Sequence, residues 1–167
     1  NHKITCYAYN VQVKRVGRFD VQKANALNIP KKLWSILQKQ QSVEFEGKTY
    51  TSDMVLGSPR KGIKVSYCTD TRPTKELPAF VENSDLFICE GMYGEKDKIQ
   101  KAKEYKHMMF TEAAEIAKKA NVNEMWLTHF SPAMPFPEEF LPSAKEIFEN
   151  THIGKDRKNV TLLFEED

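Results

Sequence analysis

The sequence contains few of the features that mark an extracellular or membrane-bound protein. It has three cysteines in 167 residues, and no two are spaced as Cys-x-x-Cys. Such an odd, scattered set of thiols predicts no disulfide framework and favours a reducing compartment, the cytoplasm. No run of about 18 apolar residues occurs, so no membrane-spanning helix is expected. Hydrophobic residues at 40% and charged residues at 29% are instead typical of a globular protein.

The formal net charge is only +2, but the charge is distributed unevenly along the chain. Residues 11–62 contain ten lysines and arginines against four aspartates and glutamates, a net charge of +6, which leaves −4 for the remainder. A basic segment on a weakly acidic body fits a surface that binds a phosphate backbone, and it fits a solvated surface loop equally well. The residues that we expect to contact nucleic acid are Lys14, Arg15, Arg18, Lys31, Lys32 and Lys39.

Hydrophobic periodicity divides the chain into a body and an insertion. Apolar alternation or short apolar runs predict strands at residues 5–13, 63–69, 86–89, 125–128 and 160–164, and helical patterns are expected near 75–83, 96–105, 111–120 and 138–149. This order of strands and helices is typical of an α/β layered domain. Residues 14–62 fit the sheet pattern poorly. They predict a short helix at 33–38 and a hairpin at 42–50 that turns at Glu46 and Gly47.

Three of the four histidines and one aspartate lie beside the ends of these elements. His2 leads into the first strand, Asp70 and His129 each follow a later strand, and His107 precedes the helix at 111–120. A ligand at the tip of a strand is held by the sheet while its side chain projects into the loop layer. Each residue alone fits an ordinary polar loop position. Together they indicate a zinc site built from imidazole and carboxylate ligands.

Five sequence motifs occur along the chain in the order in which they are found in one enzyme family. They are residues 17–24 (GRFDVQKA), 27–30 (LNIP), 55–62 (VLGSPRKG), 66–72 (SYCTDTR) and 127–131 (LTHFS). They resemble the entry to a protruding arm, the return from it, a strand that ends in Gly-Asp-Thr-Arg, and the last metal-ligand motif. The family is ribonuclease Z, the metallo-β-lactamase-fold endonuclease that trims the 3′ trailer from precursor tRNA.

The chain also departs from the pattern of that family. The family's His-x-His-x-Asp-His run does not occur in these residues, so the chain resembles the second half of the enzyme. The His-Glu-Ala-Thr loop keeps only Glu90, and the His-Ser-Thr loop keeps only His107. Lys31 and Lys32 replace a Gly-Pro pair in the arm, and Thr69 replaces a glycine. The expected metal positions are unaffected by these changes.

The resemblance implies a fold and a division of roles. The fold would be α/β, the second half of an αββα four-layer sandwich formed by residues 1–13 and 63–167, with residues 14–62 as a basic, exosite-like arm. The complete site would hold two Zn²⁺ ions, with Asp70 bridging them and with His2 and His129 each binding one. His107 would protonate the departing 3′ oxygen or stabilise charge on the phosphoryl group, and Glu90 would orient it.

The implied protein is a zinc-dependent endoribonuclease that acts on precursor tRNA as a homodimer, and the 167-residue chain alone is expected to be inactive. Two alternatives stay open. The same fold serves small-molecule hydrolases and phosphodiesterases, and a chain without the first half would be a non-catalytic fragment or an RNA-binding module. We expect Cys68 and Cys89 to be small apolar fillers and His152 to be a surface residue. Trp34 and Tyr50 could pack a small arm core or stack on a base.

Overall fold

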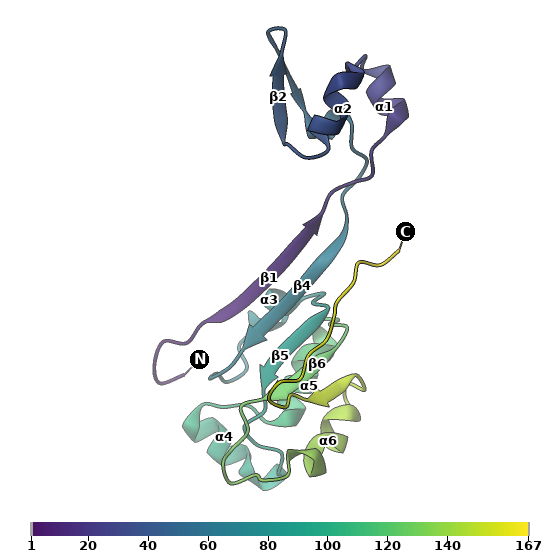
Figure 1. The fold of residues 1–167 in the computed structure, drawn as a ribbon. Coiled ribbons are helices and arrows are strands. Elements are labelled where there is room, and N and C mark those ends of the chain that lie inside the picture. The colour runs from purple at the N-terminus through teal and green to yellow at the C-terminus, as the bar shows by residue number, and fades with distance from the viewer. Residues whose placement is uncertain (1, 167) are drawn as a thin grey trace. The chain divides into compact units, whose positions relative to one another are not determined.

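The computed structural model describes residues 2–166 (Figure 1). These residues form two compact units. We call residues 2–13 and 63–164 the body, and residues 14–62 with 165 and 166 the arm. No helix among the described residues is long and apolar enough to cross a membrane.

The body is built on a five-stranded sheet with the order β1-β4-β5-β6-β7. Its strands are β1 (Ala8–Arg15), β4 (Arg60–Cys68), β5 (Leu86–Glu90), β6 (Met125–Thr128) and β7 (Thr151–Ile153). The last four pair in parallel, and β1 lies beside β4 with its arrow reversed (Figure 1). Helices lie between the parallel strands, as right-handed crossovers require. The α/β architecture expected from the sequence is confirmed.

One face of this sheet is covered by helices and forms the core. The helices of the body are α3 (Leu77–Val81), α4 (Ile99–Tyr105), α5 (Phe110–Lys119) and α6 (Leu141–Lys145), with short 3₁₀ turns η2 (Lys96–Lys98) and η3 (Pro137–Phe140). Helix α5 buries an apolar stripe from Phe110 to Ala117. Phe87, Met125 and Leu127 of the sheet are fully buried. Strands β5 and β6 are nearly continuous apolar runs, and most of their residues are buried.

The opposite face of the sheet is left largely open at its β1 edge. Asn10 of β1 hydrogen-bonds to Ser66 and to the Phe80 carbonyl on the helix side, so its neighbours along the strand face the other way. Tyr9 is 58% exposed and Val11 64% exposed. A sheet with one helix-covered face and one apolar open face corresponds to two layers of the αββα sandwich.

Most of the expected elements of the body are present, and one is wrong. The strand expected at 160–164 does not form, because residues 159–164 belong to no helix or strand and Leu163 is 80% exposed. The last strand is β7 instead, because residues 151–153 pair in parallel with β6. The helix expected at 138–149 is also shorter than predicted and ends at Lys145. The alternation in residues 160–164 led to a wrong prediction, because a strand forms only where a neighbouring strand is available to pair with it.

The arm has its own small core. It contains α1 (Val21–Ala26), α2 (Lys31–Leu37), the hairpin β2 (Ser42–Phe45) and β3 (Lys48–Thr51), and η1 (Ser52–Met54). The hairpin turns through Glu46 and Gly47, both with positive φ, as its Glu-Gly pair predicted. Helix α1 was not expected, although Asp20 caps it by accepting a hydrogen bond from the backbone of Lys23.

The aromatic residues of the arm pack inward. The buried residues of this core are Ala24, Ile29, Leu33, Leu37, Val55 and Leu56, and Trp34 and Tyr50 pack against them. Trp34 donates a hydrogen bond from Nε1 to the Ile29 carbonyl, and its ring centroid lies 5.0 Å from that of Phe19. Of the two roles considered for Trp34 and Tyr50, the structure supports packing.

Candidate metal centre

The parallel register brings the ends of three strands to one edge of the body. Cys68 pairs with Cys89 and Glu90 pairs with Thr128, so β4, β5 and β6 end side by side. Asp70, Glu90 and His129 therefore meet at this edge although they lie far apart in the sequence. Asp70 has φ 55° and His129 has φ 57°. Left-handed backbone is uncommon for such residues and tends to occur at functional sites.

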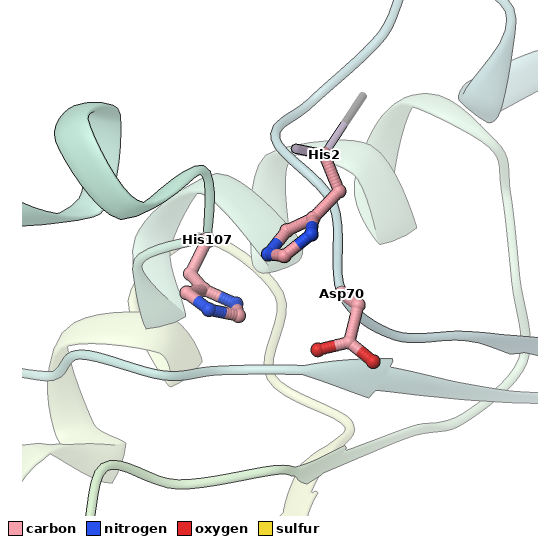
Figure 2. A group of neighbouring side chains, drawn as sticks. All are labelled: His2, Asp70 and His107. Atoms are coloured by element: carbon pink, nitrogen blue, oxygen red, sulfur yellow. The ribbon is translucent and has the colours of Figure 1, made fainter. Parts of the chain in front are cut away.

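His2, Asp70 and His107 form the first group of possible metal ligands. The chosen nitrogen and oxygen atoms of these three residues all lie within 4.8 Å of one another. Figure 2 shows the side chains converging from three segments: the start of the chain, the loop after β4 and the loop before α5. The ring centroids of His2 and His107 are 5.1 Å apart. One ion could contact all three side chains.

A second group shares His107 with the first. It consists of Glu90, His107 and His129, whose candidate ligand atoms also lie within 4.8 Å of one another. Asp70 connects the two groups, because its Oδ1 lies 3.2 Å from His129 Nε2. The side chains of Asp70 and His129 are 42% and 36% exposed, so a substrate can reach them. All five residues expected at the site thus lie together.

His2 supplies the test of whether a metal ion fits. Both of its ring nitrogens are buried, and neither has a hydrogen-bond partner in the described part of the chain. A buried polar atom without a partner costs about 1–3 kcal/mol. Its neighbours within reach are a carboxylate and a second imidazole, which is the donor set that zinc uses. The residues present therefore fit a metal ion, which would satisfy a nitrogen of His2.

Glu90 and His107 form a buried pair beside this cluster. The Glu90 side chain is fully buried, and its Oε2 lies 3.0 Å from His107 Nδ1. The same carboxylate accepts hydrogen bonds from the backbone N–H groups of Thr71 and Met108. Burial raises the pKa of Glu90 against the opposing effect of these two donors. Burial likewise lowers the pKa of His107, although the Asp70 carboxylate opposes this shift. Both shifts reflect the cost of holding a charge in this buried place.

Arg72 connects the loop that contains His107 with the segment after β4 that contains Asp70. Its Nη1 donates to the His107 carbonyl at 2.6 Å and to Glu112 Oε2 at 2.6 Å, while Nη2 donates to Glu112 Oε1. Glu112 Oε2 also accepts the backbone N–H of Met109 at 2.9 Å, which caps α5. Sequence reasoning assigned no role to Arg72 or Glu112. The capping role of Glu112 could have been recognised from its position, because Glu112 lies three residues after the N-cap residue Met109.

The remaining expected residues lie elsewhere. Lys14, Arg18, Lys31, Lys32 and Lys39 are exposed on the arm, where Arg15 is half-buried. Cys68 and Cys89 are buried on the helix-covered face and belong to neither group of ligands among residues 2–166, as expected. Burial raises the pKa of the Cys68 thiol to about 11. The His152 side chain is 40% exposed, in agreement with a surface position.

Comparison with known proteins identifies the family. A family profile described as "Beta-lactamase superfamily domain" matches residues 15–130. The chain belongs to the beta-lactamase superfamily. Within this superfamily it is 57% identical to a protein named Ribonuclease Z from Agathobacter rectalis, over 99% of the chain and 55% of that protein. A protein of the same name from Clostridium acetobutylicum is also 57% identical, over 99% and 53%. The resemblance to ribonuclease Z is thereby confirmed.

Two further findings bear on this superfamily member. The chain spans about half the length of the curated relatives that it matches. Among solved structures, the metallo-beta-lactamase fold protein YhfI from Bacillus subtilis is similar with a TM-score of 0.49 and 30% identity, over 56% of this chain and 37% of that one.

Proposed function

We propose that the protein is a zinc-dependent endoribonuclease that removes 3′ trailers from precursor tRNA, with this chain supplying His2, Asp70, Glu90, His107 and His129. The observation that carries the proposal is the convergence of these five side chains in two groups of possible metal ligands that share His107, one of which contains the buried His2 nitrogens that have no partner among residues 2–166. The relatives that match 99% of the chain are named Ribonuclease Z, which supports RNA as the substrate.

Zinc fits the donor set better than the harder divalent ions. Imidazole and carboxylate ligands together suit Zn²⁺, whereas Mg²⁺ prefers oxygen ligands alone. His2 with Asp70 would hold one ion and His129 with Asp70 a second. When bound, the ions would supply positive charge that activates water and neutralises phosphoryl oxygens. The exposed fractions of Asp70 and His129 leave that side of the site open to a phosphodiester.

The Glu90–His107 pair would supply the proton that the departing 3′ oxygen takes up. Glu90 Oε2 would accept a hydrogen bond from His107 Nδ1 and orient the ring. The Nε2 proton of the protonated imidazole would pass to the leaving oxygen as its bond to phosphorus breaks, which leaves a neutral His107 that still donates from Nδ1 to Glu90. The N–H groups of Thr71 and Met108 hold the Glu90 carboxylate in place for this role.

The arm would contribute affinity for the tRNA backbone. Lys31 and Lys32 begin α2 and are exposed, and the ammonium of Lys32 lies 3.7 Å from the centroid of the Phe45 ring. A lysine held beside a ring is partly ordered before it meets a phosphate, which lowers the entropic cost of binding.

We further propose that the protein acts as a cytoplasmic homodimer. The open apolar face of the sheet and the free thiols support this part of the proposal.

The test uses the protein as encoded, with any residues that its gene places before Asn1. End-labelled precursor tRNA and bis(p-nitrophenyl) phosphate are offered to the wild type, to Asp70→Asn, and to the double variant Lys31→Gln, Lys32→Gln. Asp70→Asn should abolish both reactions. The arm variant should weaken only RNA cleavage and should flatten its salt dependence by about 0.9 in log–log slope per lost phosphate contact.

The matched control neutralises Lys118 and Lys119, which lie in the last turn of α5 and belong neither to the arm nor to the site. This variant should behave as the wild type on both substrates. Hydrolysis of the small diester without cleavage of precursor tRNA would contradict the proposal and indicate a small-molecule phosphodiesterase. Failure to bind zinc and to hydrolyse either substrate would indicate a non-catalytic protein.

A further inference from the structure

An exposed aromatic ring lies at the point where the chain enters the site. Tyr105 is the last residue of α4 and is 47% exposed. Lys106 follows with φ 66° and turns the chain sharply, so that His107 comes next with its ring among the ligands. An aromatic residue at such a position could have been buried against the body. Instead about half of its surface faces solvent beside the cluster.

The segment that carries His2 reaches the same ring. Lys3 Nζ lies 5.4 Å from the centroid of the Tyr105 ring, and the neighbouring His2 ring lies 5.1 Å from that of His107. Two adjacent residues of one segment thus contact two nearby residues of another. The cation beside the ring is held by the attraction between its charge and the ring quadrupole. This attraction places a positive charge and an exposed ring next to the proposed ligands.

The segment that leads through α4 to His107 carries a net positive charge. Between Gly94 and His107 it contains five lysines and three acidic residues, namely Lys96, Lys98, Lys101, Lys103 and Lys106 against Glu95, Asp97 and Glu104. Lys98 pairs with Asp97, and Lys101 and Lys103 are exposed. The Glu90 loop lies alongside the His107 loop because Tyr93 and Met109 form an isolated bridge. The segment with the exposed ring and the loop of Glu90 therefore both lead to the His107 loop.

We propose that Tyr105, with Lys3 beside it, is a stacking platform for an unpaired nucleotide of RNA next to the scissile phosphate. A single strand offers a base face and a phosphate in each nucleotide, and an exposed ring with adjacent cations matches both. This inference rests on the proposed function, because it presumes an RNA cut at the histidine cluster. It adds a residue that selects unpaired over paired nucleotides at the cleavage point.

The experiment measures binding of precursor tRNA with 2-aminopurine in the first unpaired position of the trailer. Stacking quenches the fluorescence of this base. Tyr105→Phe should bind and quench as the wild type does, because the ring is retained. Tyr105→Leu, which keeps apolar bulk but no π face, should bind about 5- to 100-fold more weakly and leave the base fluorescent. Lys3→Gln should cause a smaller loss, and Lys118→Gln on α5 serves as the matched control.

An abasic substrate separates stacking from an indirect effect on His107. With no base at that position, the wild type and Tyr105→Leu should bind equally. A difference between them that persists on the abasic RNA would overturn the inference. Equal affinity and equal quenching on the intact RNA would do the same. A wild type that does not cleave precursor tRNA at all would refute the proposed function itself.

Discussion

Replacing Arg72 by methionine should destabilise the protein and misplace His107. The guanidinium pairs with both carboxylate oxygens of Glu112 and also donates to the His107 carbonyl. The Arg72 and Glu112 side chains are only 15% and 19% exposed. Removing one partner of a buried pair costs about 3–5 kcal/mol because the other charge stays buried. Partial exposure reduces the loss here to about 2–4 kcal/mol.

The double-mutant cycle tests whether the two residues are energetically coupled. Glu112→Met should also destabilise, and it additionally removes the cap on the Met109 N–H, which contributes about 1 kcal/mol. The double variant removes both charges at once, so it should lose less than the sum of the single losses by about 2 kcal/mol. For a domain of this size each kcal/mol lowers Tm by roughly 2–4 °C.

The assay is thermal and urea unfolding of the protein as encoded, followed by circular dichroism. In a variant that is still folded at the assay temperature, kcat should fall while zinc content stays unchanged, since no proposed metal ligand is replaced. The reasoning would be refuted by single losses below about 1 kcal/mol that add without coupling in the double variant. It would also be refuted by a folded Arg72→Met protein with wild-type kcat, because His107 would then be positioned without this anchor.

Three further predictions follow from the site and the core. His2→Ala should lower the zinc content measured by plasma mass spectrometry, whereas His152→Ala, a surface control, should retain it; equal zinc in both would remove His2 from the ligands. His107→Ala should keep its zinc but cleave about 10²–10⁴-fold more slowly, and an unchanged rate would make the residue structural. A raised pKa means less thiolate, so at pH 8 only about 10⁻³ of Cys68, with a pKa of about 11, is ionised. Peptide mapping at pH 8 should then show iodoacetamide modifying Cys6 before Cys68, which is both buried and largely protonated; equal rates would contradict this.

Local sequence was enough for elements whose pattern and partners agree. The apolar runs that became β5 and β6 were recognised because a buried parallel strand is apolar throughout, and the hairpin because Glu46 and Gly47 suit its turn. Local sequence was not enough for residues 160–164, which alternate but have no neighbouring strand to pair with among the described residues. It also missed α1, a helix of six residues whose stability comes from packing against the arm core.

The sequence also determined which side chains could take part in the chemistry, because the identity of a residue and the motif around it are local properties. This holds for His2, Asp70, His107 and His129. Only the tertiary structure decided that they meet. The parallel register of β4, β5 and β6 brings the Asp70, Glu90 and His129 positions to one edge. Burial of Glu90, the orphaned nitrogens of His2 and the anchoring by Arg72 depend on atoms contributed by segments far apart in the chain. Solvent exclusion and hydrogen-bond partners are properties of packed space, and a one-dimensional pattern does not contain them.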